Sequence, residues 1–397
     1  MTGGNEMNGL FVRQADSNEA LLEPKPPTSP ISEYVLVTLP QDLYAIQVAN
    51  MDYFDLYAKQ SMLLDEVSPL IAENADVDIA KVTQLDLGFM LGGYLPLGDD
   101  AYDMAPPQLF KLLEEQATRF GLPKRMDYEL IIDINNREYT RTGQMRTFLN
   151  GNNALDERDF YKGHSESEPY IKAVASHLKG LADNPNSHDN GTTVELALAD
   201  MKIFREYMGR YMHLTTEVFG LMRKYLVSYP DGTRNASGAF MPSVQLAELA
   251  LHKPTEGQNL YISEALNYFP GWSRDAITGF QNDSAEGINV TDLVLNGQMV
   301  LSEHGIDCLI KLVEEFIRFR TTHLAVVRKQ IPEAFRGHVP ISKQQIREFG
   351  EPNILAGDVK GTAGFDVINV LAGAAHRLII TQDKLVHFRD SAKLSVN

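Results

Sequence analysis

One histidine of this chain stands in a different setting from the other nine. His323 lies deep in the helical pattern Leu301–Ile331, and Phe319, Val326 and Val327 are its apolar neighbours one turn to either side. A lone histidine on such a face is most often a hydrogen-bonded core residue. Haem binding is a chemistry that needs only one such histidine, because the porphyrin supplies four nitrogens and one imidazole supplies the proximal ligand.

Two other residues of the same stretch limit what His323 can do. Arg320 precedes it by three residues and lies on the same side of the helix, where it could meet a carboxylate such as a haem propionate. The nearest upstream histidine, His304, lies 19 residues away, or roughly 28 Å along a helix. The two histidines therefore cannot share one metal ion on this helix.

Lys360–Phe365 (KGTAGF) is a second unusual element. Its two glycines flank Thr362 and Ala363 directly before a predicted helix. One interpretation is a helix N-cap, made by Thr362 or Asp366. The other is a mobile loop that closes over a bound ligand and excludes water.

The third element is Phe280–Gly297 (FQNDSAEGINVTDLVLNG). The simplest interpretation is a loop followed by an amphipathic helix. Asp292 lies in that helix, and a buried carboxylate there would require a partner. Arg320 is the candidate partner.

Composition and missing motifs exclude several classes of protein. The chain has no G-x-x-x-x-G-K-[ST] phosphate loop, H-E-x-x-H zinc helix or G-x-S-x-G nucleophile elbow. Its only cysteine, Cys308, rules out an intramolecular disulfide and fits a cytoplasmic protein. A net charge of −17 disfavours nucleic acid and anionic membranes as partners. No run approaches the about 20 apolar residues that span a bilayer, and the N-terminus lacks the order of a secretory signal.

The elements that must position these residues are predicted to be helices. The chain has 397 residues, of which 44% are hydrophobic and 22% charged, as in a folded globular protein. Residues 1–30 are polar and proline-rich and are expected to form a flexible arm. Residues 31–120 are expected to form a small, mostly helical domain, and residues 121–397 a large helical one. Gly121-Leu122-Pro123 marks the expected boundary.

Apolar spacing predicts helices at Met51–Ala72, Pro106–Phe120, Glu195–Tyr229, Leu301–Ile331 and Phe365–Ile380. Ser302 is expected to cap the fourth of these helices. Tyr128–Ile134 (YELIIDI) is a short apolar run that is expected to be a strand or a buried extended segment. The predicted fold class is therefore mainly α.

Three motifs follow one another in a specific order: DSAEG with DLVLNG, then RFRTTHLAVV (Arg318–Val327), then KGTAGFDVINVL (Lys360–Leu371). They resemble the Ser-Ala-Gly segment and following helix, the proximal-haem helix, and the Lys-Gly-Thr-Gly-Gly loop of the indoleamine 2,3-dioxygenase superfamily. The resemblance covers residues 261–380, about a third of the chain. Fainter similarities within residues 86–143 point to the divergent branch typified by monodechloroaminopyrrolnitrin synthase, whose chemistry rearranges an indole ring.

The resemblance implies a role for each matching residue. His323 would be the proximal ligand of haem b, with Arg320 and Asp292 as an ion pair beside a propionate. Other residues implied to contact the cofactor or the substrate are Phe316 and Val327 beside the haem, Ser284 and Ala285 near the distal pocket, and Gly361, Thr362, Ala363 and Gly364 in a loop over the substrate.

One departure from the family pattern concerns substrate binding. The family's carboxylate-binding arginine has no match five residues after Tyr261, where Leu266 or Asn267 stands. Arg274 lies further on and is the candidate substitute, because an amide does not replace a bidentate guanidinium.

The function implied is that of a haem-dependent oxygenase acting on tryptophan or a related indole-type aromatic amino acid derivative, in specialised metabolism. O₂ or peroxide would be the co-substrate, and oxygen would be inserted at the indole ring or the ring rearranged. One alternative is a non-catalytic haem protein that senses or binds a diatomic ligand, and another is an all-α interaction protein without a cofactor. The sequence does not decide which residue lies on the distal side of the haem; the candidates are Ser176, His177, Tyr139 and Phe148. It also does not decide between a monomer and a homodimer.

Overall fold

The computed structural model describes residues 29–330, 339–355 and 365–394. Within these ranges the chain forms helices joined by turns and loops, and no strand occurs in them. The predicted mainly α fold class is therefore confirmed. The two-domain division at residue 120 stays a prediction, and residues 1–28 of the expected arm lie outside the described ranges.

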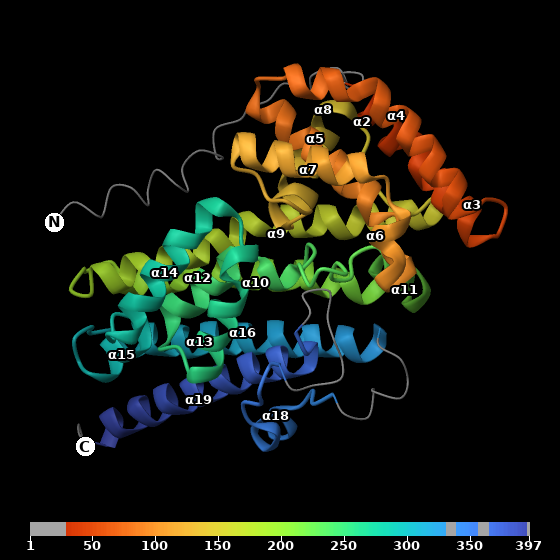
Figure 1. Ribbon diagram of the computed structural model, residues 1–397. Coiled ribbons are helices and arrows are strands. Elements are labelled where there is room, and N and C mark those ends of the chain that lie inside the picture. The colour runs from red at the N-terminus through yellow and green to blue at the C-terminus, as the bar shows by residue number, and fades with distance from the viewer. Residues whose placement is uncertain (1–28, 331–338, 356–364, 395–397) are drawn as a thin grey trace.

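The first group of helices lies at one end of the molecule (Figure 1). It consists of α2 (Pro30–Glu33), α3 (Leu39–Gln47), α4 (Tyr53–Glu73), α5 (Val77–Gly92), α6 (Ala101–Met104), α7 (Pro107–Phe120) and α8 (Asn135–Thr142). Helix α5 forms the centre of the group: it contacts α4 and α7, and all its residues from Val82 to Gly92 are buried. Helix α7 ends as predicted at Gly121, which adopts a left-handed conformation with φ 66°.

A buried ion pair ties α5 to the segment that leads into the second group. The guanidinium of Arg146 donates to both carboxylate oxygens of Asp86, and these side chains are 1% and 0% exposed. Ser32 on α2 donates to the same carboxylate at 2.5 Å. The opposite charges offset the cost of desolvation at this depth, so α2, α5 and residue 146 are held together.

The second group contains four long helices that pack in the order α9, α10, α16 and α19 (Figure 1). Its members are α9 (Gly151–Asp183), α10 (Asn190–Arg210), α11 (Thr216–Lys224), α12 (Pro242–Leu251), α13 (Glu256–Ala265), α14 (Gly271–Ala285), α15 (Val290–Leu295), α16 (Glu303–Gln330), α18 (Lys343–Phe349) and α19 (Val367–Leu394). Helix α12 packs on α9, and α14 packs on α12. The predicted cap of α16 is confirmed, because the Ser302 hydroxyl accepts from the Gly305 N–H at 3.1 Å.

The prediction of a strand or extended segment at Tyr128–Ile134 is wrong. Glu129–Ile134 forms a π-helical turn that continues directly into α8, and its leucine and isoleucine side chains are buried. The turn contacts both α5 and α9. A short run of apolar residues looks the same in a buried strand and in a buried helical turn. The hydrophobic periodicity of the sequence therefore could not distinguish the two structures.

The prediction of one continuous helix at Glu195–Tyr229 is also wrong. Helix α10 ends at Arg210, and α11 begins at Thr216. Thr215 between them is extended, and its hydroxyl accepts from the Val218 N–H as an N-cap. The apolar spacing continues across this break, which is why the pattern concealed it. The last helix is longer than predicted, since α19 continues beyond Ile380 to Leu394.

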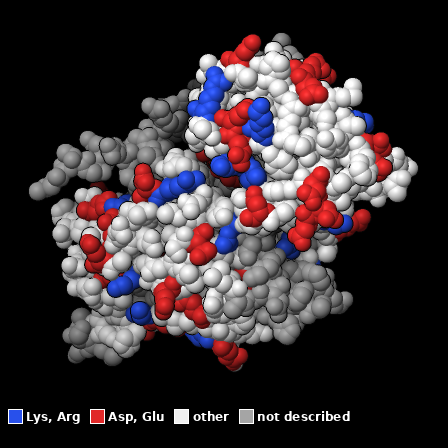
Figure 2. Space-filling view, in the orientation of Figure 1, with Lys and Arg blue, Asp and Glu red and all other residues white. Residues whose placement is uncertain are grey.

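The surface shows acidic and basic side chains interspersed on the face drawn in Figure 2. The large apolar side chains Phe54 and Met62 on α4 are 71% and 75% exposed. Within the described ranges, no helix combines the length and the apolar character needed to cross a bilayer.

Candidate cofactor site

A cavity lies between the long helices and contains His323. Its wall comes from α9, α10, α11, α12, α13, α16 and α19 and from the segment before α12. Most of the wall is apolar and includes Phe160, Phe204, Met208, Phe219, Met222, Leu226, Val244, Phe319, Val326 and Val327. The polar groups are fewer and comprise His164, Ser167, Arg223, Ser237, Gln245, Glu248, Tyr261, Arg320, His323 and Arg377. An apolar cavity with a few convergent polar groups is typical of a ligand or cofactor site.

The imidazole of His323 is unpaired. Its Nδ1 atom is buried and has no hydrogen-bond partner among the described residues, and none of them bonds its Nε2 atom. Burial, together with the smaller effects of Arg320 and His164, lowers the pKa of His323 to about 3. The ring is therefore neutral at physiological pH, which is the form that coordinates a metal.

Arg320 lies one turn before His323 and is paired with Glu248 on α12. Its Nε and Nη2 atoms donate to the same carboxylate oxygen, Oε1, at 2.8 and 2.5 Å. Both side chains are buried, and the second oxygen of Glu248 has no partner in the described part of the chain. The pair joins α16 to α12 and fixes the turn that carries His323.

The predicted ion pair between Arg320 and Asp292 is therefore wrong. The Asp292 side chain accepts instead from the Asn289 amide at 2.9 Å, while the Asn289 side chain accepts from the Asp292 N–H at 3.0 Å. These bonds hold the carboxylate at the N-terminus of α15, where its charge is favourable. A signal for the true partner was present in the sequence, because Glu248 is the one charged residue in the apolar run 244–251.

His164 reaches the same cavity from α9. Its Nδ1 lies 2.9 Å from the carbonyl oxygen of Phe160 and 2.9 Å from the hydroxyl of Tyr211. A carbonyl only accepts, so the proton lies on Nδ1 and Nε2 carries the lone pair. Burial lowers the pKa of His164 to about 4, so this ring is also neutral.

The segment Ala236–Met241 forms the wall beside His164. A Cβ on Gly238 would lie 3.1 Å from His164 Nε2, so only glycine leaves this approach free. Ser237 accepts from the Ala239 N–H at 3.2 Å, and Tyr261 donates its hydroxyl to the Ala239 carbonyl. The first bond is internal to the segment, and the second ties it to α13.

Several residues predicted for the site lie elsewhere. Arg274 on α14 donates to the carbonyls of Phe269 and Asn267, at 2.9 and 3.0 Å. Ser284 donates to the carbonyl of His252 at 2.9 Å, and neither it nor Ala285 is in the cavity wall. Of the two predicted apolar contacts Val327 lines the cavity, whereas Phe316 is fully buried and does not. The predicted loop Gly361, Thr362, Ala363 and Gly364 lies outside the described residues.

The four open candidates for the distal side are also absent from the wall. His177 pairs with Asp200 at 3.3 Å, and Phe148 stacks on Tyr225 with ring centroids 4.9 Å apart. Neither Ser176 nor Tyr139 lines the cavity.

Arg223 on α11 supplies a guanidinium to the cavity wall, and burial lowers its pKa. Sequence reasoning missed this residue because it placed α11 inside one long amphipathic helix. The spacing Phe219-x-x-x-Arg223 was a usable signal, since residues four apart share a face and both line the cavity.

Comparison with known proteins does not assign this chain to a family. No protein-family model matches the sequence, and no curated protein is significantly similar to it. The chemistry of the cavity must therefore be argued from its residues.

The donor set of the cavity fits a cofactor that needs one imidazole. A metal ion held only by protein would require three or four ligands at one point. Among the described residues, no three histidine, cysteine or acidic side chains of the cavity wall converge on one point. A neutral histidine that has no hydrogen-bond partner in the described part of the chain and lies in an apolar cavity fits the single protein ligand of haem iron.

Proposed function

We propose that this chain is a haem-dependent oxygenase of the indoleamine 2,3-dioxygenase superfamily, acting on tryptophan or a related indole-type compound. The observation that carries the proposal is the neutral imidazole of His323, which is unpaired among the described residues and faces an apolar cavity. The buried Nδ1 atom without a partner costs free energy, and a ligand bound to that atom would remove the cost. The sequence resemblance at Arg318–Val327 supports the same role for this histidine.

Haem held by His323 would supply the activation of O₂ or peroxide. The chain's own residues would position the reactants. The phenylalanine and aliphatic side chains of the wall would hold flat apolar rings and exclude water. Arg320, fixed by Glu248, would orient the turn that carries His323.

Two further residues would contact the substrate. His164 Nε2 carries a lone pair and would accept a hydrogen bond from an indole N–H. Arg223 would bind the carboxylate of an amino-acid substrate, the role that the sequence alone led us to expect of Arg274.

A second candidate function also rests on His323. Haem held by His323 would also bind a diatomic ligand in the apolar cavity, without a hydrogen bond from His164, because its Nε2 carries the lone pair and cannot donate. A haem protein that binds such a ligand without turnover would need no Arg223. The two functions therefore differ in their response to indole compounds.

The test is the absorption spectrum of the untagged protein produced with ample haem precursor. Wild type, His323→Ala and the matched control His177→Ala are compared in the ferric, ferrous and ferrous–carbon monoxide forms. We expect a Soret band in the wild type and in the control, its loss or shift in His323→Ala, and its recovery when imidazole is added. A colourless wild type would overturn the proposal. Titration with tryptophan and indole, with product analysis, separates the oxygenase from the ligand-binding protein.

A further inference from the structure

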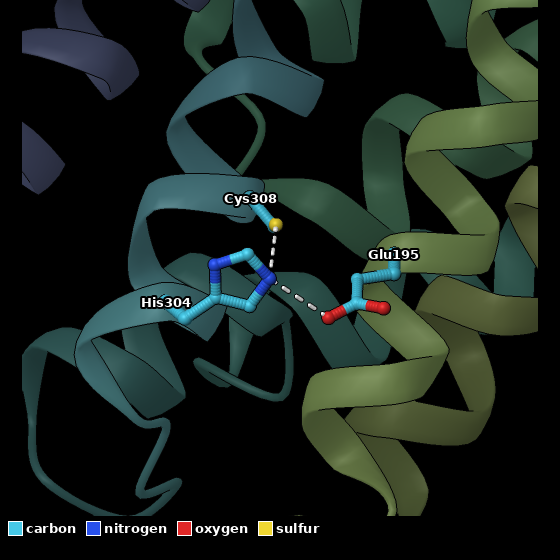
Figure 3. A group of neighbouring side chains, drawn as sticks. All are labelled: Glu195, His304 and Cys308. Carbon is cyan, nitrogen blue, oxygen red and sulfur yellow. Dashed lines mark hydrogen bonds and ion pairs between the residues drawn. The ribbon is translucent and has the colours of Figure 1, made fainter.

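A second group of ligand-type side chains lies at the surface, at the start of α16. It comprises Glu195 on α10 and His304 and Cys308 on α16 (Figure 3). His304 Nε2 lies 3.0 Å from Glu195 Oε1 and 3.6 Å from Cys308 Sγ. One ligand atom from each residue lies within 4.8 Å of the other two.

The fold brings these three residues together in a simple way. His304 and Cys308 are four residues apart, so they share one face of α16. Helix α10 packs against that helix and presents Glu195 to the same point. The group is independent of the cavity, because His304 and His323 are separated by roughly 28 Å along α16.

Two of the three distances between the ligand atoms are close to what a tetrahedral metal requires, and the third, from oxygen to sulfur, is within 4.8 Å. Bonds of 2.0–2.3 Å to nitrogen, oxygen and sulfur place neighbouring ligand atoms about 3.3–3.7 Å apart. The nitrogen–sulfur distance of 3.6 Å already agrees, and the nitrogen–oxygen distance of 3.0 Å needs a small opening. Both His304 and Glu195 are exposed, with side chains 70% and 49% accessible, so they can make this adjustment.

We propose that Glu195, His304 and Cys308 form a binding site for a zinc-type divalent metal ion, with water as the fourth ligand. The donor set selects the metal: thiolate and imidazole suit Zn²⁺, whereas Mg²⁺ and Ca²⁺ require oxygen ligands. The buried Cys308 would form the floor of the site, and the exposed His304 and Glu195 would leave the fourth position open to solvent.

Binding would displace one proton, because the ligand is the thiolate. The Cys308 thiol would lose its proton to solvent, the sulfur–metal bond would form, and no group would change oxidation state. Burial and the negative charge of Glu195 raise the pKa of this thiol. The metal would neutralise that charge and so offset the cost of ionising the thiol.

A metal ion bound at this site would link α10 to α16, two helices that line the cavity. Helix α10 contributes Phe204 and Met208 to the wall, and α16 contributes His323. An ion that binds the folded chain and not the unfolded one stabilises it by mass action. We therefore expect zinc to raise the melting temperature of the wild type.

The test uses untagged full-length protein and three measurements: calorimetric titration with Zn²⁺, the melting temperature with and without Zn²⁺, and the difference spectrum on adding Co²⁺. We expect a thiolate-to-cobalt charge-transfer band in the wild type and in His177→Gln. The latter is a matched control, because His177 pairs with Asp200 on α10 without a cysteine nearby. In Cys308→Ser and His304→Gln we expect the band to vanish and zinc affinity to fall at least about 100-fold, beyond the range for outer-shell changes.

Two results would overturn the site. One is a wild type that takes up zinc no more tightly than Cys308→Ser, and the other is a cobalt spectrum without a thiolate band. Glu195→Gln keeps the test valid if the cysteine variant does not fold, because this half-exposed side chain can change without disturbing the core. We expect it to weaken zinc binding at least about 10-fold. The haem spectrum is a separate readout, so failure here leaves the proposed oxygenase function unaffected.

Discussion

Arg320 and Glu248 form a buried ion pair in which two guanidinium nitrogens donate to one carboxylate oxygen, at 2.8 and 2.5 Å. Their side chains are only 7% and 1% exposed. The pair joins α16, which carries His323, to α12, which also contributes residues to the cavity wall. It is therefore the contact through which α12 controls the position of the candidate ligand.

Removal of the Glu248 charge should be strongly destabilising. In Glu248→Gln the guanidinium of Arg320 stays buried without a counter-charge, and loss of one partner of such a pair costs about 3–5 kcal/mol of unfolding free energy. Asp292→Asn is the matched control, because the sequence pointed to Asp292 as the partner. We expect it to cost about 1 kcal/mol or less, since it loses part of one hydrogen bond. Urea denaturation measures both, and equal costs would show that Arg320 does not depend on Glu248.

The sequence did not predict α9, which has 33 residues. It did predict the helical class and, near their observed bounds, helices α4, α7 and α16. These features depend on local spacing, which a single chain reveals directly. Helix α7 and its end at Gly121 agree with the prediction almost to the residue. The cap of α16 by Ser302 was predictable for the same reason.

The partners of these residues were not predictable, because they depend on how distant segments pack. Glu248 lies 72 positions from Arg320 in the chain. His164 and Gly238 meet only because α9 and the segment before α12 lie side by side in the cavity wall. Arg223 was missed for a local reason. The helix is interrupted at the N-cap Thr215, but the apolar spacing of the sequence continues across the interruption.

Burial of His164 should make stability depend on pH. Its pKa is lowered by burial to about 4 in the folded chain, against about 6.5 in an unfolded one. Between these values the unfolded chain binds a proton that the folded chain does not, so stability is lost as the pH falls from 6.5 towards 4. Relative to His164→Gln, the wild type should lose up to about 3 kcal/mol over that range.

Denaturation curves at pH 7.5, 6 and 5 test this dependence. His188→Gln, which removes an exposed histidine between α9 and α10, controls for the loss of a histidine as such. A free-energy difference between wild type and His164→Gln that stays constant with pH would show that His164 is protonated to the same extent in both states.

A methyl group on Gly238 should disturb the cavity and little else. In Gly238→Ala the new Cβ would lie 3.1 Å from His164 Nε2, so the imidazole or the segment must shift by a few tenths of an ångström. Gly238 has no positive φ, so we expect a change in unfolding free energy below about 1 kcal/mol. Ligand binding that depends on His164 should weaken about 10-fold.

Gly209→Ala is the matched control, because a Cβ there meets no atom within 4 Å. The double variant His164→Ala with Gly238→Ala supplies the stricter measurement by spectral titration. If the glycine acts through the histidine, its effect on affinity should disappear in the histidine variant. An undiminished effect would assign the glycine a role of its own.

Arg223 should determine whether the substrate needs a carboxylate. It lines the cavity, whereas Arg274 on α14 is absent from the cavity wall and donates to the backbone carbonyls of Phe269 and Asn267. A charge-assisted hydrogen bond contributes about 1.5–3 kcal/mol, so Arg223→Gln should weaken tryptophan binding about 10- to 100-fold and leave indole binding nearly unchanged. Arg274→Gln should change neither. Spectral titrations of both variants with tryptophan and indole decide between the two arginines. If Arg274→Gln loses tryptophan binding and Arg223→Gln retains it, the substrate carboxylate binds outside the cavity described above.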